Sequence, residues 1–185
     1  VRDQLFDRDP LANDVATAAH PDAVRNIFGR RNTIAVGAAF GVITVIGSKD
    51  TGNVEVATFR SDAEYIDGRH PVGVTFCGAR EDALRRDFTI NGLFFDPITG
   101  NVIDYVGGQN DLNEGVVRAI GDPIMRFEED HLRMLRAIRF SANFAFPIEL
   151  ETRKAIVVLA GKVESVSPER LAAELRLMFS RHGRG

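Results

Sequence analysis

Cysteine is almost absent from this sequence, since Cys77 is the only one in 185 residues. A single thiol cannot close an intramolecular disulfide, which excludes the disulfide-stabilised scaffolds of small secreted proteins. Long apolar runs are absent too, and none approaches the roughly 20 residues that a membrane-spanning helix needs. No signal peptide is recognisable at the start. We therefore expect a cytoplasmic protein with no membrane partner.

An excess of basic residues is also missing, because the formal net charge is −3. This balance argues against strong non-specific binding of nucleic acid by the whole surface. Arginines nevertheless cluster in Arg30-Arg31 and Arg85-Arg86, so a local basic site remains open. With 44% hydrophobic and 26% charged residues, the chain can form one globular domain, or a domain with a short appendage. The oligomeric state is left open.

The periodicity of the apolar residues divides the chain into two parts. In residues 1–121 it predicts an α/β pattern of the α+β class, a small mixed sheet with helices on one side. Helices are expected over 1–5, 21–28 and 81–86. Strands are expected over 14–17, 33–36, 41–46, 54–59, 88–95 and 102–104, with a long polar loop over 60–80.

From Asp122 onward the period is helical. We expect helices over 122–144 and 149–159, and a third from Ser167 that buries Leu171, Leu175 and Met178. The expected organisation is a head at 1–121 and an all-helical neck at 122–185. Because Val1 stands within an expected helix, we expect the head to be incomplete at its amino end and the neck at its carboxyl end.

The segment Arg85-Arg86-Asp87-Phe88-Thr89-Ile90-Asn91-Gly92 is the strongest chemical signal. It places two guanidinium groups, a carboxylate and an amide where a short helix enters an apolar strand. Guanidinium forks bind phosphate oxygens and ribose hydroxyls, and a neighbouring carboxylate can accept from a hydroxyl. A solvated helix end with a salt bridge explains the same residues equally well.

A second signal is Glu129-Asp130-His131-Leu132-Arg133-Met134-Leu135-Arg136. On one helix, Glu129, Arg133 and Arg136 would share a face, with Asp130 at its edge. The opposite face would carry Phe127, Met134, Ile138 and Ala142. A carboxylate and a guanidinium three residues apart suit the edge of a nucleotide base. Taken alone, an ordinary surface Glu–Arg pair is the simpler interpretation.

A third segment, Asp104-Tyr105-Val106-Gly107-Gly108-Gln109-Asn110-Asp111-Leu112, joins the expected head to the expected neck. Paired glycines allow backbone geometry that other residues cannot adopt. The segment is therefore either a plain turn or a hinge.

These three segments, with Arg118-Ala119-Ile120-Gly121-Asp122-Pro123 and Arg126-Phe127, closely resemble the class II tRNA nucleotidyltransferase/poly(A) polymerase family, one of the polymerase-beta-like nucleotidyltransferases. The resemblance covers residues 54–150, and more weakly 167–179. It implies that Arg85, Arg86 and Asp87, in one motif with Asn91, bind the ribose and triphosphate of the incoming nucleotide.

The resemblance also implies that Glu129, Asp130 and Arg133, with Arg136 on their face, form an amino-acid template. In it, Asp130 and Arg133 would pair with the edges of C and A. Residues 60–76 resemble the family's flexible loop, which helps to switch specificity from C to A, and their few apolar anchors predict poor order without substrate.

At the amino end, Val1-Arg2-Asp3 resembles the end of the family's Gly-Gly-x-Val-Arg-Asp motif, which implies triphosphate contacts for Arg2 and Asp3. Asp7 stands where the family usually has Gly.

The family's metal motif, Asp-x-Asp before Ala-Thr, is changed in this chain. Carboxylates two residues apart on a strand face the same way and can hold Mg²⁺. Asp14 keeps the second position, as the catalytic and metal-binding carboxylate, whereas Ala12 occupies the first. Asp9 is a possible substitute. Glu55 is the candidate for a third catalytic carboxylate, with a plain exposed strand residue as its alternative.

The function that the resemblance implies is Mg²⁺-dependent transfer of CMP and AMP from CTP and ATP to tRNA 3′ ends, with release of pyrophosphate. CC-adding and A-adding versions are not separated from it. Poly(A) polymerase is an alternative, although residues 36–45 lack the basic and aromatic run usual in its bacterial members. The alternative of another class is a nucleotide- or RNA-binding relative that has lost catalysis, and Ala12 supports it.

Overall fold

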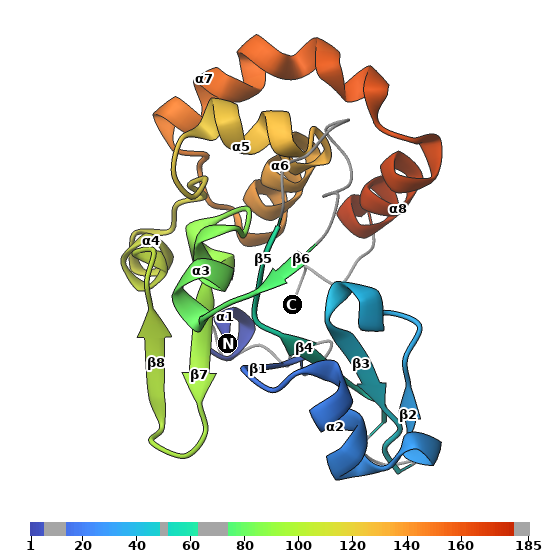
Figure 1. The fold of residues 1–185 in the computed structure, drawn as a ribbon. Helices are drawn as coiled ribbons and strands as arrows, with labels where there is room; N and C mark the ends of the chain where they lie inside the picture. Colours follow the sequence, from blue (N-terminus) through green and yellow to red (C-terminus); the bar gives the residue numbers. More distant parts are fainter. Residues whose placement is uncertain (6–13, 49–51, 63–73, 180–185) are drawn as a thin grey trace. The chain divides into compact units, whose positions relative to one another are not determined.

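The computed structural model describes residues 1–5, 14–48, 52–62 and 74–179. Asp7, Asp9, Ala12 and residues 63–73 of the expected loop lie outside the described residues. The described residues divide into two compact units, the first within residues 1–85 and the second within 86–179. Their helices and strands are labelled in Figure 1. The expected α+β class, with a small mixed sheet and several helices, is confirmed.

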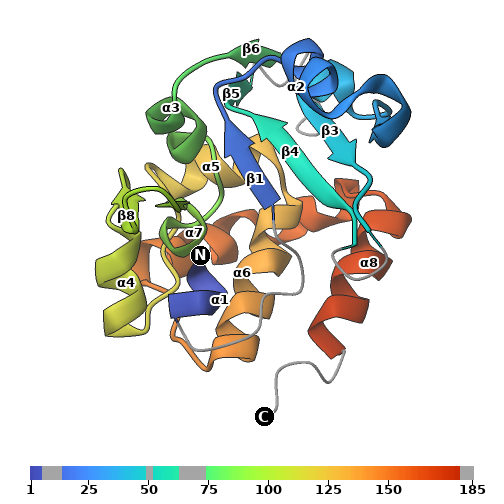
Figure 2. The ribbon, with the colours of Figure 1, turned by 90° about the horizontal axis from the view of Figure 1, so that it is seen from below.

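The first unit is built on a four-stranded mixed sheet in the order β1-β4-β3-β2. Strand β1 (Asp14–Thr17) runs parallel to β4 (Val54–Thr58). Strand β3 (Val42–Val45) is antiparallel to both β4 and β2 (Thr33–Ile34), and β4 lies between β1 and β3 in Figure 2. All four strands were expected at these places, with small differences at their ends.

Helix α2 (Pro21–Phe28) covers one face of this sheet. It begins after His20, whose side chain accepts from the Asp22 N–H, and ends at Gly29, where φ is 85°. Val24 of α2 packs against Ile43 and Val56 of the sheet, and all three are buried. Because side chains alternate along a strand, residues that neighbour Ile43 and Val56 in the chain point to the opposite face.

The prediction of a loop over the whole of residues 60–80 is wrong at both ends. Strand β5 (Arg60–Asp62) pairs with β6 (Val74–Phe76), and α3 (Ala79–Leu84) starts two residues earlier than the expected helix. The buried Asp82 carboxylate explains this order, because it accepts from the Arg60 N–H and from the Arg85 guanidinium. The unit also contains α1 (Arg2–Leu5) and two 3₁₀ turns, η1 (Arg30–Asn32) and η2 (Ala38–Phe40).

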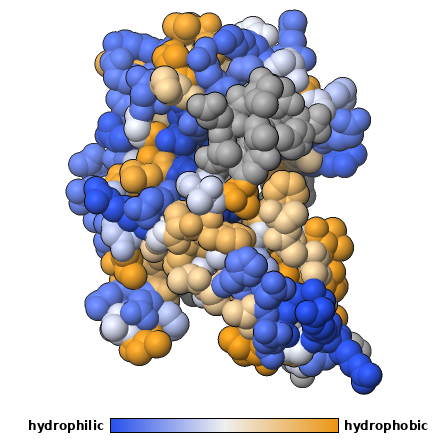
Figure 3. Space-filling view, in the orientation of Figure 1, coloured by the Kyte–Doolittle hydropathy of each residue, from blue (hydrophilic) through white to orange (hydrophobic). Residues whose placement is uncertain are grey.

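The second unit begins with irregular backbone and then a hairpin. The strand expected over 88–95 is wrong in its first half, since η3 (Thr89–Asn91) is a 3₁₀ turn and β7 (Leu93–Asp96) starts only after it. The Thr89 hydroxyl donates to Asp111 over 2.6 Å, which fixes this turn from a distant residue. Strand β8 (Asn101–Asp104) completes the hairpin, whose tip in Figure 3 is mostly hydrophilic with one hydrophobic patch at its end.

From Pro123 to Phe179 every element that the structure describes is helical, as expected. The single helix expected over 122–144 is wrong, however, because α5 (Pro123–Glu129) and α6 (Leu132–Phe144) are separate. The backbone at Asp130 is extended, with φ −153° and ψ 105°. The expected apolar face is also wrong in part, since Arg133 is buried, whereas Ile138 is 40% exposed and Ala142 is exposed.

The last helices begin and end near the expected residues. Helix α7 (Leu150–Leu159) is capped by Glu149, and η4 (Ala160–Ser165) leads to α8 (Pro168–Phe179). The expected burial of Leu175 is wrong, since it is 41% exposed while Glu174 is buried, because Glu174 forms an ion pair with Arg139 of α6. Within the described part of the chain, no helix combines the length and apolarity that crossing a bilayer requires.

The glycine pair after β8 begins a helix that the sequence did not predict, α4 (Gly108–Glu114). The Asp104 carboxylate accepts from the N–H groups of residues 106, 107, 108 and 109, and Gly107 has a φ of 78°. Gly108 is buried so tightly that a Cβ there would lie 2.2 Å from the Thr89 carbonyl oxygen. The segment is therefore a capped helix start that is packed against η3, and the plain-turn interpretation is wrong.

Replacing Gly108 by Ala is expected to destabilise the protein by about 2–3 kcal/mol, because the backbone of η3 must move to admit the methyl group. Urea unfolding measures this loss. Gly161→Ala is the matched control, since nothing lies within 4 Å of a Cβ at that position. Equal stability of the two variants would contradict the expectation.

Candidate functional site

Asp87 is the centre of a hydrogen-bonded cluster in the second unit. Its Oδ1 accepts from the Phe88 N–H over 2.8 Å and from Asn91 Nδ2 over 2.9 Å. Its Oδ2 lies 2.6 Å from Nη2 and 2.7 Å from Nε of Arg136, so two nitrogens of one guanidinium group donate to the same oxygen. Three residues of the expected nucleotide site, Asp87, Asn91 and Arg136, are therefore brought together.

The charge state of this cluster follows from its contacts. Burial raises the pKa of Asp87, but the Arg136 charge and the hydrogen bonds from Asn91, Arg136 and the Phe88 N–H outweigh it, so the pKa lies below its ordinary value. Burial lowers the pKa of Arg136, and the carboxylates of Asp87, Glu174 and Asp130 reverse this effect. Both groups are thus charged at neutral pH.

Arg86 is positioned beside this cluster by the same 3₁₀ turn. Its Nη1 donates to the Asn91 carbonyl oxygen over 2.9 Å, and its guanidinium carbon lies 4.6 Å from the centre of the Phe94 ring. Stacking on an aromatic face and one backbone bond fix the plane of a guanidinium while it stays partly exposed. Such a group can bind phosphate oxygens.

The end of α5 and the start of α6 hold a second cluster. Arg133 Nη1 donates to Glu129 Oε2 and, over 3.0 Å, to the Arg126 carbonyl oxygen. Glu129 also accepts from Arg126 Nη1 over 2.9 Å, so one carboxylate is shared by two guanidinium groups. The expected Glu129–Arg133 pair is present. Arg133 is only 8% exposed, so it is not a solvated surface arginine.

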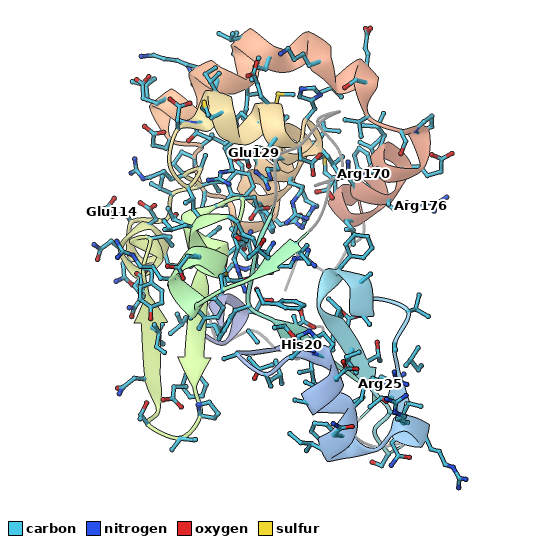
Figure 4. The ribbon with its side chains drawn as sticks, viewed as in Figure 1. His20, Arg25, Glu114, Glu129, Arg170 and Arg176 are labelled. Carbon is cyan, nitrogen blue, oxygen red and sulfur yellow. The ribbon has the colours of Figure 1, made fainter. Side chains whose placement is uncertain are left out.

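Asp130 lies between the two helices and has a different partner. Its Oδ1 accepts from the Leu132 N–H over 3.1 Å, and its Oδ2 accepts from Arg170 Nη2 over 2.7 Å. The side chains of Asp130 and Arg133 are thus both held in place by other residues. Figure 4 shows Glu129 at the end of α5 and Arg170 on α8.

In the first unit, Asp14 of β1 and Glu55 of β4 are direct partners in parallel strands. Both are exposed and lie on the sheet face opposite α2, because Val56, the neighbour of Glu55, faces α2. Two adjacent carboxylates suit a hard divalent cation that keeps water as its other ligands. Among the described residues, no group of three or more His, Cys, Asp or Glu side chains is placed to hold a metal.

The remaining expected nucleotide-binding residues also belong to the first unit. Arg2 Nε donates to the adjacent Asp3 over 2.9 Å. Arg85 Nε donates to the Arg60 carbonyl oxygen over 2.7 Å, and Nη2 lies 2.7 Å from Asp82. Arg85 therefore ties α3 to β5, a structural contact that the sequence interpretation did not include.

Two arginines that contact the expected template residues Glu129 and Asp130 were not among the expected site residues, namely Arg126 and Arg170. Arg126 stands three residues before Glu129, and this spacing on a helix is a usable signal. Arg170 is 40 residues from its partner Asp130, so no local pattern identifies it.

Comparison with protein families gives two matches. Residues 1–118 match the family described as the poly A polymerase head domain. Residues 145–183 match the family described as the probable RNA and SrmB-binding site of polymerase A.

Individual relatives agree with this assignment. The chain is 41% identical over 180 residues to the CCA-adding enzyme of Bacillus pumilus, covering 97% of this chain and 44% of the relative. The CCA-adding enzyme of Bacillus stearothermophilus in complex with CTP superposes with a TM-score of 0.85 at 35% identity, covering 96% and 42% of the two chains. The Thermotoga maritima CCA-adding enzyme complexed with tRNA gives 0.74 at 26% identity, covering 97% and 41%. The chain thus spans less than half the length of these relatives.

Proposed function

Because this chain belongs to the poly A polymerase head domain family, we propose that it carries the nucleotide-binding part of an RNA 3′-end nucleotidyltransferase. The reaction is addition of CMP and AMP from CTP and ATP to the 3′ end of tRNA, with release of pyrophosphate. The relatives named as CCA-adding enzymes support this choice over poly(A) synthesis. A cytoplasmic location fits the single cysteine.

The observation that carries the proposal is the fixed guanidinium of Arg133. A buried arginine held by Glu129 and a backbone carbonyl presents its donors in one orientation, which suits recognition of a base edge. Asp130 supplies an acceptor three residues before it. Together they provide the donor and acceptor set that distinguishes C and A from other bases.

Other residues have distinct roles in the proposal. Arg86 binds the triphosphate, and the family resemblance assigns the same role to Arg2, Asp3 and Arg85. Asp87 binds the ribose, and Asn91 and Arg136 hold its carboxylate in place. Asp14 and Glu55 hold Mg²⁺, which supplies charge neutralisation at the reacting phosphates when it is bound. A head–neck boundary near Gly121 is supported by the head-domain match, which ends at residue 118.

A second candidate function is nucleotide or RNA binding without catalysis. The observation that favours it is Ala12, which stands two residues before Asp14 where the resembled motif has a carboxylate. Nucleotide binding should survive in that case, since Arg86, Asp87 and Arg133 are held by partners within residues 86–136.

Equilibrium binding of CTP, ATP, UTP and GTP tests the proposed function independently of catalysis. Arg133→Ala is expected to reduce the preference for CTP over UTP by roughly one to two powers of ten, because a bidentate base contact is worth about 1–3 kcal/mol. Arg86→Ala is expected to weaken all four nucleotides alike, since phosphate contacts carry no base information. If the wild-type protein binds all four equally, or Arg133→Ala weakens them uniformly, the template proposal is wrong.

A further inference from the structure

The guanidinium group of Arg86 is held on its face by an aromatic ring. Its central carbon lies 4.6 Å from the centre of the Phe94 ring. Its Nη1 donates to the Asn91 carbonyl oxygen over 2.9 Å, so its edge is held as well. A face contact and an edge contact together define the plane of the group and its orientation within that plane.

The kind of group that holds a guanidinium decides how much of its charge remains for a ligand. Arg136 is held by the carboxylate of Asp87, which balances its charge and accepts from two of its nitrogens. The ring of Phe94 carries no charge and lies against the face of Arg86, whereas the N–H donors of an arginine point outward from its edge. Phe94 can therefore position Arg86 without neutralising its charge or occupying its donors.

Phe94 is itself fixed by the β7–β8 hairpin. It stands opposite Ile103 in the register of the two antiparallel strands, and it is partly buried. Side chains alternate along a strand, so the adjacent Phe95 points to the opposite face, where it is 45% exposed. The strand therefore carries the same side chain on both faces, and Phe94 is the one whose ring lies against Arg86.

The ring contact can be changed separately from the Asp87 cluster. Asn91 accepts from Arg86 through its backbone carbonyl and donates to Asp87 Oδ1 through its side chain, over 2.9 Å in both cases. A substitution at Phe94 removes the ring and alters neither group of Asn91. The Asp87 carboxylate would keep its donors while the face of the Arg86 guanidinium lost its support.

We propose that Phe94 is a positioning residue for triphosphate binding, which holds the Arg86 guanidinium in one plane and leaves its charge available to phosphate oxygens. This inference rests on the proposed function, in which Arg86 binds the triphosphate. Without the ring, the guanidinium turns about its bond to Asn91, and ordering it again costs part of the binding free energy. The loss is the same for every nucleotide, because the phosphates are common to all four.

The test is binding of CTP, UTP and inorganic triphosphate to the 185-residue chain carrying Phe94→Leu. All three affinities are expected to fall by roughly three- to fivefold, the size of a cation–π contact at a partly exposed site, while the preference for CTP over UTP is unchanged. Phe94→Tyr keeps the ring and should retain the wild-type affinities. Phe95→Leu is the matched control, because it removes the neighbouring ring from the opposite face of β7 and should leave binding unchanged.

A double-mutant cycle separates positioning of Arg86 from a general effect on the fold. If Phe94 acts through Arg86, Phe94→Leu has no further effect on triphosphate affinity in a protein that already carries Arg86→Ala, since the group that the ring holds is gone. Equal losses in the two backgrounds would overturn the inference, because the ring would then act independently of the guanidinium.

The outcomes also separate this inference from the proposed function. If Arg86→Ala weakens triphosphate binding but Phe94→Leu does not, Phe94 has no positioning role and the proposed function stands. If the wild-type protein does not bind triphosphate, or Arg86→Ala leaves its affinity unchanged, the triphosphate role of Arg86 is wrong and the inference with it. A loss in Phe95→Leu as large as that in Phe94→Leu also overturns the inference. Should Phe94→Leu not fold, a lower triphosphate affinity in a folded Phe94→Met supports the inference, and an unchanged affinity overturns it.

Discussion

Ala12→Asp is expected to raise CMP incorporation by about two to three powers of ten, because a second metal carboxylate contributes several kcal/mol to charge neutralisation in phosphoryl transfer. The carboxylate would stand two residues before Asp14 on the chain, the spacing of the resembled motif. Incorporation of labelled CMP into tRNA that lacks its 3′ end, with Mg²⁺ and saturating RNA, measures the change.

Ala12→Asn is the control, because it has nearly the same shape as Asp without the charge, and it should leave incorporation low. Asp14→Asn in the Ala12→Asp background should remove the gain. If both substitutions at residue 12 behave alike, the missing carboxylate does not limit catalysis. Unchanged nucleotide binding with no incorporation in any variant would favour the non-catalytic relative.

Arg136→Leu is expected to destabilise the protein by roughly 3 kcal/mol at neutral pH, since removing the partly exposed partner of a buried carboxylate leaves an uncompensated charge. The charge left behind is that of Asp87, whose side chain is 8% exposed. Urea unfolding measures the loss. Arg153→Leu on α7 is the control, because Arg153 is exposed, and its effect should stay within about 0.5 kcal/mol.

The pH dependence of this difference has a definite sign. The pKa of Asp87 is lowered in the folded protein, so its ion pair contributes fully above the unfolded carboxyl pKa of about 3.9. The contribution is lost as the pH falls from there through the lowered folded pKa. Wild type and Arg136→Leu should therefore converge in acid. A difference that is the same at pH 3 and pH 7 would contradict the ionic origin.

Residues at the ends of a helix predicted those helices that begin and end through contacts with neighbouring residues. Helix α2 was predicted from Pro21 at a first-turn position, and the structure adds the caps His20 and Gly29. Helix α7 was predicted to start at Glu149, which the structure shows to be its capping residue. The break between α5 and α6 could not be predicted in this way, because the apolar period continues across Asp130. The extended backbone there is accompanied by a contact to Arg170, 40 residues away.

In the candidate site too, contacts between residues close in sequence could be predicted, and contacts between distant residues could not. The Glu129–Arg133 pair was predicted from the spacing of four residues on one helix. It forms although the helix is broken between the two residues. Asp87 and Arg136 are 49 residues apart, and only the family resemblance placed both in one site before the structure joined them. Arg85 is the opposite case. The resemblance assigned it to the nucleotide, whereas in the structure its guanidinium pairs with Asp82, three residues before it.

The Asp104 cap has a consequence for where phosphate can bind. A glycine pair before a helix usually offers its N–H groups to a phosphate, but here a tethered carboxylate already accepts from four of them. A nucleotide would have to expel an anion of the protein's own chain to use this turn. In the proposed function the triphosphate is bound by arginine side chains instead, so its affinity should fall steeply as salt is added.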